Sequence, residues 1–170
     1  MAGLAHLGVG LAAKRVAPNM PVGWLVAAAY GIDIVWAGFW AAGVEHLPAP
    51  GVNSAAPWSH GLLMSLVWSL TAAALTMLIS RNRRTTLIIG LLVFSHWVVD
   101  FISKPMLSAY PSDSGVTLLF DTSRTVGLGL YRSAIGTNIG EYGTTAAGLI
   151  IYIATLILMK KRFAQGRRAA

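Results

Sequence analysis

The chain has 170 residues, of which 55% are hydrophobic and only 11% are charged, and its formal net charge is +7. An average soluble domain has about 25% charged residues, and the mean hydropathy here is +0.63, so the composition excludes an ordinary soluble protein and indicates one integral membrane domain. The absence of cysteine excludes disulfides and thiolate metal ligands.

Apolar runs predict an all-α bundle. The first run, residues 1–13, is too short to span a bilayer and predicts a short N-terminal helix packed into the bundle. Four further runs are long enough to cross about 30 Å of hydrocarbon, which needs roughly 20 helical residues. These predicted full spans are residues 21–44, 58–80, 85–103 and 138–159.

The basic residues predict how the bundle is oriented. Ten of the thirteen lie in three clusters at the ends of apolar runs, at 14–15, 81–84 and 160–168. The other three, Lys104, Arg124 and Arg132, lie in the connection 104–137. The positive-inside rule therefore predicts a cytoplasmic tail at 160–170 and an external connection at 104–137 that folds over the outer face. This distribution also argues against a nucleic-acid partner and for membrane lipids.

Ionisable residues within the apolar runs are candidate functional groups, because such residues are costly inside a bilayer. His96 and Asp100, in "LLVFSHWVVDFIS", are four residues apart and share one helical face. Asp33, His60 and His6 lie in or at the ends of other runs. With about 1.5 Å of rise per residue from the basic ends, these groups spread from ~12 Å to ~30 Å in depth. They can form one compact site only if helices tilt or break.

Histidine nitrogen and carboxylate oxygen, without sulfur, suit zinc, manganese or iron(II). We therefore expect a divalent metal, with zinc as the first choice, bound by His96 and Asp100 together with Asp33, His60 and His6.

Other interpretations remain open at this stage. His96 could be a neutral core histidine bonded to a backbone carbonyl, and His60 and His96 could instead ligate haem. Asp100 and Glu141 could be helix-end residues paired with Arg124 or Arg132. Glu45 and His46, at a predicted helix end, are more simply explained as solvated groups.

Four short motifs recur in order in a bacterial family: "AHLGVGLA", "YGIDIV", "WSHGLLMSL" and "FSHWVVDF". The chain resembles the small inner-membrane proteins described as predicted membrane-bound metal-dependent hydrolases, which include LexA-regulated membrane hydrolases. A later stretch, "RTVGLGLYRS", is similar to an uncharacterised branch of that family. The resemblance implies metal ligation by the same five residues, location in the bacterial inner membrane and a hydrolase activity.

The expected function is metal-dependent hydrolysis of an ester or phosphoester, with a lipid or lipid-linked substrate reached at the outer face. Glu141 is the candidate general base, and Arg132 or Arg124 would balance developing negative charge. The alternative is a metal-ion or proton-coupled transport or metal-handling protein that uses the same residues as an ion path. A non-catalytic membrane factor with a structural metal is a third possibility.

Overall fold

The computed structural model describes residues 3–46 and 56–169, and these are mostly helical. The helical elements are α1 (Gly3–Ala12), the 3-10 turn η1 (Ala13–Arg15), α2 (Val22–Ala29), α3 (Gly31–Ala41), α4 (Leu62–Ser80), α5 (Arg83–Ser103) and α6 (Ala134–Ala169). Two short strands, β1 (Val116–Thr117) and β2 (Thr125–Val126), pair antiparallel. The prediction of a helical fold is confirmed, apart from this hairpin.

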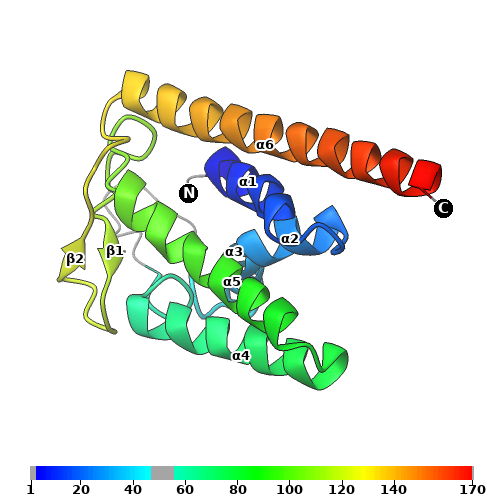
Figure 1. Cartoon of the computed structure of the whole chain (residues 1–170). Coiled ribbons are helices and arrows are strands. Elements are labelled where there is room, and N and C mark those ends of the chain that lie inside the picture. The colour runs from blue at the N-terminus through cyan, green and yellow to red at the C-terminus, as the bar shows by residue number, and fades with distance from the viewer. Residues whose placement is uncertain (1–2, 47–55, 170) are drawn as a thin grey trace.

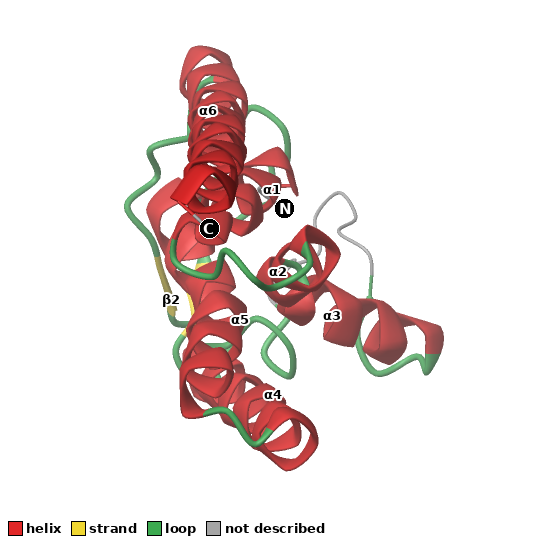
Figure 2. Ribbon diagram, turned by 45° about the vertical axis from the view of Figure 1, so that its right-hand side comes forward, coloured by secondary structure: helices red, strands yellow, loops and turns green. Residues whose placement is uncertain are grey.

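Three helices, α4, α5 and α6, are long and apolar enough to cross a membrane. The predicted single span at 21–44 is instead two helices, α2 and α3, bent by 59° (Figure 2). The break lies at Tyr30, which stands between the two helices and caps both, with φ −91° and ψ 7°. The described residues contain up to four candidate spans if this bent pair counts as one, so four full spans are not confirmed, and residues 21–44 do not form one continuous helix.

The short helix α1 lies beside α6, and glycine makes the close approach possible (Figure 1). A Cβ on Gly148 would come within 2.1 Å of the Gly8 carbonyl oxygen, and one on Gly8 within 2.4 Å of the Thr144 carbonyl oxygen. Small residues of this kind allow helix backbones to pack closely where both surfaces are apolar. The predicted short N-terminal helix therefore packs into the bundle as expected.

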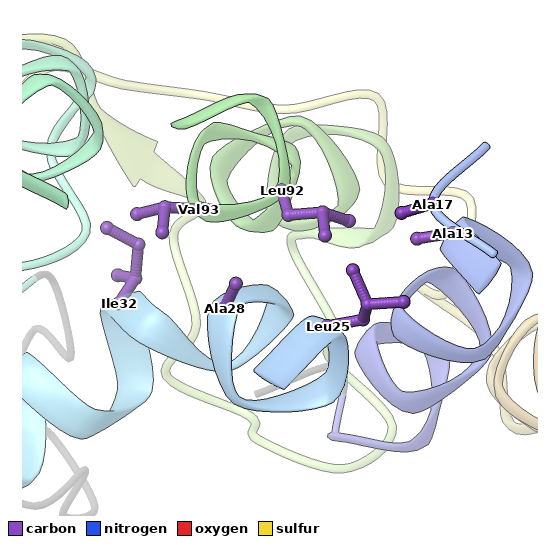
Figure 3. Packing of buried hydrophobic residues seen from close by; sticks show 7 residues of the cluster. All are labelled: Ala13, Ala17, Leu25, Ala28, Ile32, Leu92 and Val93. Carbon is purple, nitrogen blue, oxygen red and sulfur yellow. The ribbon is translucent and has the colours of Figure 1, made fainter. Parts of the chain in front are cut away.

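The main apolar core joins η1, α2, α3 and α5 (Figure 3). Leu25 and Ile32, which flank the helix break, are fully buried, and they pack with Leu92 and Val93 of α5. This packing fixes both halves of the broken helix against α5. The break is thus held in place by the core on either side of it.

The connection between α5 and α6 covers one end of the bundle. Backbone N–H groups of residues 128–131 donate to the carbonyl oxygens of residues 101–104, at 2.7–3.1 Å. The last carbonyls of a helix have no partner within the helix, so the returning chain caps α5. The hairpin lies at this end, beyond α4 and α5 (Figure 1).

The turn after η1, the turn between α4 and α5, and the far end of α6 lie together at the opposite end of the molecule (Figure 1). The three basic clusters belong to these segments. Their common position is compatible with the predicted orientation. The side of the membrane on which they lie stays a prediction.

Candidate metal centre

Five ionisable side chains, contributed by four parts of the chain, meet inside the bundle. His6 comes from α1, Asp33 from the first turn of α3 and His60 from just before α4, while His96 and Asp100 come from α5. His6, His96 and Asp100 each have only 1% of their surface exposed. All five residues predicted as ligands are thus brought together, because the break between α2 and α3 and the position of α1 remove the predicted spread in depth.

Short distances join the imidazole Nε2 atoms to the carboxylates. His6 Nε2 lies 3.4 Å from Asp100 Oδ1, and His60 Nε2 lies 3.3 Å from Asp33 Oδ1. His96 Nε2 is 3.7 Å from that same Asp33 oxygen. Ligand atoms lie within 4.8 Å of one another in two groups of three, His6–His96–Asp100 and Asp33–His60–His96. The two groups share His96.

The histidine rings also pack against one another. The His6 ring stacks on the His96 ring with centroids 3.7 Å apart and planes 10° apart. His60 meets His96 edge to face at 5.2 Å. A porphyrin does not fit between two rings in contact, so this arrangement does not support haem ligation by His60 and His96.

The tautomer of His96 is set by the end of α2. Its Nδ1 lies 3.0 Å from the carbonyl oxygen of Ala29, the last residue of α2. A carbonyl oxygen only accepts, so Nδ1 carries the proton and Nε2 offers its lone pair to the cluster. The interpretation of His96 as bonded to a backbone carbonyl is correct for Nδ1, and this bond leaves Nε2 directed at Asp33.

The tautomer of His60 is set by a chain of two hydrogen bonds. Ser59 Oγ donates to Glu45 Oε2 at 2.6 Å, and His60 Nδ1 lies 2.7 Å from the same Oγ. A hydroxyl has one proton to donate, so Ser59 must accept from Nδ1–H of His60. Carboxylate partners that orient the outer nitrogen of a histidine are typical of metal sites.

Glu45 is buried, with 4% of its surface exposed, and not a solvated helix-end residue as the sequence suggested. Its Oε1 also accepts from the backbone N–H groups of Trp58 and Ser59, at 2.8 and 3.1 Å. His46 is exposed, as expected. Periodicity gives no signal for Glu45, because its partners are reached only when the chain folds back on itself.

At His60 and His96 the cluster therefore places Nε2 lone pairs against carboxylate oxygen. The buried cluster atoms that lack a hydrogen-bond partner include His6 Nε2, Asp33 Oδ1, His60 Nε2 and Asp100 Oδ1, whereas Asp100 Oδ2 faces Lys104 Nζ at 2.9 Å. Buried polar atoms left in this state cost about 1–3 kcal/mol each. A cation between them would remove that cost, so the buried histidine and aspartate groups could hold a metal ion, and a nitrogen and oxygen donor set fits a divalent one.

Lys104 joins the cluster, although the sequence placed it only in the external connection. Its Nζ lies 2.9 Å from Asp100 Oδ2. Burial alone would lower the pKa of Lys104, but the Asp100 carboxylate raises this pKa above its ordinary value, so the side chain is charged. The i, i+4 spacing from Asp100 could have indicated this pair. Asp100 is therefore paired with Lys104, whereas Arg124 pairs with Asp121 at 3.5 Å.

Glu141 is buried beside the cluster, where it holds the start of α1. Its Oε2 accepts from the backbone N–H of Ala5, the residue before His6, at 2.8 Å. Thr145 Oγ1 donates to the carbonyl of Leu4 at 2.7 Å, and the Tyr30 hydroxyl donates to that of Gly3. These bonds position His6. Glu141 belongs to neither group of three. The Arg132 side chain is exposed. The catalytic roles of Glu141 and Arg132 stay predictions.

A scan against family models found no match, and neither the curated proteins nor the solved structures include one that is significantly similar to this chain. The resemblance to membrane-bound hydrolases therefore stays an expectation.

Proposed function

We propose that the protein is a membrane-embedded, metal-dependent hydrolase with a divalent metal, zinc as first choice, bound by His6, Asp33, His60, His96 and Asp100. The observation that carries the proposal is the convergence of buried nitrogen and oxygen atoms, with the tautomers of His60 and His96 fixed from outside the cluster. Such a centre is preorganised for a cation, because its lone pairs already point inward.

The charges next to the cluster support a divalent ion. Three carboxylates, Asp33, Asp100 and Glu45, and one ammonium, Lys104, are joined to it by ion pairs or hydrogen bonds. With neutral histidines these four groups leave two negative charges, and Glu141, buried beside the cluster, adds a further one. Uncompensated buried charge is expensive, and one divalent cation would offset the two negative charges of the four groups.

One ion fits better than two. His96 has only Nε2 available, since Nδ1 is committed to Ala29. The two groups of three share His96, so its one available nitrogen can serve an ion in only one of them at a time. Asp33, whose side chain is 13% exposed, is the least buried of the five and marks the side where water or substrate would arrive.

A bound metal would supply Lewis acidity and lower the pKa of a coordinated water toward about 7. The chain's own residues then have distinct tasks. Glu45 and Ser59 orient His60, Ala29 orients His96, and Lys104 holds Asp100. The proposed substrate is an ester or phosphoester, lipid or lipid-linked, at the outer face of the bacterial inner membrane. Glu141 is retained as the proposed general base.

The competing proposal is metal-ion or proton-coupled transport. The observation that favours it is the broken helix, since Asp33 lies in the first turn of α3, directly after the break. Transporters often place ion sites at interrupted helices near the middle of the bilayer.

Elemental analysis of detergent-purified protein tests the metal first. We expect wild-type protein to retain a divalent metal, and His96→Ala and Asp100→Ala to lose it. Asp121→Ala, a matched acid-to-alanine change at an exposed position, should retain it. Wild-type protein without metal, and without thermal stabilisation by zinc, manganese or iron(II), would overturn the metal centre.

The second stage separates enzyme from transporter. Metal-loaded protein is assayed with generic esters, phosphodiesters and then labelled phospholipids, and in parallel for metal flux in proteoliposomes. Hydrolysis that is lost in Asp100→Ala and kept in Asp121→Ala supports the hydrolase. Flux without hydrolysis supports the transporter.

A further inference from the structure

An apolar cavity of about 650 Å³ lies between the broken helix and the pair α4–α5, away from the candidate metal centre. Its walls include Ala27, Gly31, Leu75, Ile89 and Val93. Other lining side chains, such as Trp24, Ile34 and Ile79, are 59–86% exposed, so the cavity opens sideways. Because α4 and α5 are apolar enough to span a membrane, this opening would face hydrocarbon.

Toward the metal centre, the cavity ends in tight packing. Val93 lies so close to Gly31 that a Cβ there would come within 3.1 Å of its methyl carbon. Ala28 and Val93 line this end, and Val93 packs beside Ile32 of the core (Figure 3). None of the five candidate ligands lines the cavity. The cavity is therefore a separate feature, with its apolar end toward the middle of the bundle.

A second cavity of about 210 Å³ shares two lining residues with it, Met20 and Thr85. The lining of this smaller cavity includes Asn19, Asn82 and Arg84 beside apolar residues such as Val16 and Ile88. The segments that line it, residues 16–20 and 82–88, lie at the end of the molecule where the basic clusters gather (Figure 1). An apolar cavity thus neighbours a smaller one that carries a cation.

Two cations at this end, Arg84 and Lys14, are each held by a backbone carbonyl oxygen. Arg84 Nη2 donates to the Val16 carbonyl at 2.8 Å, which leaves most of the five guanidinium donors available. Lys14 Nζ donates to the Met20 carbonyl at 2.6 Å. Val16 and Met20 both belong to the turn that follows η1. Within residues 3–46 and 56–169, no carboxylate lies within 4.0 Å of either cation.

We infer that these neighbouring cavities bind one anionic phospholipid, with its phosphate at Arg84 in the smaller cavity, near Lys14, and an acyl chain in the larger apolar cavity. Arginine suits phosphate because its planar donors bind two oxygens at once. Basic residues at the ends of membrane helices attract anionic headgroups. The volume lies in the range of specific ligand sites, about 300–1,000 Å³. This inference does not depend on the proposed hydrolysis.

The test measures stabilisation of detergent-purified full-length protein by phosphatidylglycerol and by phosphatidylcholine with the same acyl chains. Phosphatidylglycerol should bind more tightly, and Arg84→Gln should weaken its binding about tenfold, as expected for a lost charge-assisted hydrogen bond. Arg83→Gln makes the same charge change at the neighbouring exposed residue, which lines neither cavity. It should have a much smaller effect.

A second variant tests the proposed site of the acyl chain and leaves Arg84 unchanged. Ala27→Phe fills the apolar cavity, so both lipids should bind more weakly. If Arg84→Gln does not fold, retained phosphatidylglycerol affinity in Ala27→Phe overturns the inference. Equal losses in Arg83→Gln and Arg84→Gln would mean diffuse surface charge only. Stabilisation by inorganic phosphate alone would mean an ion site without a lipid chain, and equal binding of the two lipids would remove the anionic requirement.

Discussion

Replacement of Ser59 by alanine tests the hydrogen-bonded chain that orients His60. Ser59 is fully buried, and its hydroxyl is the link between Glu45 and the outer nitrogen of His60. Removal of Oγ leaves His60 Nδ1–H and Glu45 Oε2 without that partner. Glu45 keeps two backbone bonds on its other oxygen, so the loop around it should still fold.

The expected loss of metal affinity in Ser59→Ala follows from the role of Ser59 and Glu45 in orienting His60. Loss of a group that orients a metal-bound histidine typically lowers metal affinity 10–100-fold, or ~1.4–2.8 kcal/mol. At a zinc concentration a hundredfold above the wild-type Kd, metal binding stabilises the fold by ~2.7 kcal/mol. The same concentration should stabilise Ser59→Ala by only ~0.4–1.4 kcal/mol.

Competition titration with a chelator and thermal unfolding with and without zinc measure the two quantities. Ser69→Ala is the matched control, because Ser69 is also buried but donates only to the Ser65 carbonyl within its own helix. It should bind zinc as the wild type does. If Ser59→Ala also binds zinc with wild-type affinity, the Glu45–Ser59 chain does not act on a metal ligand.

Three further predictions concern other parts of the chain. Glu141→Gln should keep fold and metal, because the amide oxygen can still accept from Ala5 N–H, while loss of a general base would slow hydrolysis ~10²–10⁴-fold; loss of metal would instead make Glu141 a ligand. Gly148→Ala should destabilise the packing of α1 on α6 by about 1–3 kcal/mol in thermal unfolding, whereas Gly23→Ala, with open space around it, should not. Reporters fused after residue 170 and within residues 108–114 should score as cytoplasmic and external, respectively, and a reversed pattern would refute the orientation deduced from the basic clusters.

The fold was largely predictable from hydrophobic patterning. The apolar runs that became α4, α5 and α6 are long enough to identify spans without any tertiary information. The break at Tyr30 was not predictable, because no proline marks it. It depends on packing of Ile32 and Leu25 against α5, and on the absence of a side chain at Gly31, where Val93 approaches.

The candidate site was predictable in its residue types but not in its surroundings. Ionisable groups in apolar helices are expensive, and this cost was sufficient to single out the five residues that meet. Depth counted along straight helices separated His6 from His60, and only the bent helix and the buried start of α1 bring them together. Glu45 was interpreted as a solvated helix-end group and Lys104 only as a cation of the external connection, because each lies just beyond a predicted span.

Hydrogen bonds from outside the cluster fix the orientation of two of its histidine rings, which limits the hydrogen bonds that the cluster can form internally. With Nδ1–H of His60 and His96 committed to Ser59 and Ala29, neither ring can turn its Nε2 lone pair away without breaking a buried hydrogen bond. Asp33 Oδ1 faces both Nε2 atoms. Two added protons or one divalent ion would equally neutralise the two excess negative charges of Asp33, Asp100, Glu45 and Lys104. Only a metal ion can accept several of these lone pairs at one point, and the crowding of Nε2 atoms around Asp33 and Asp100 therefore favours a metal centre over a set of separate protonated pairs.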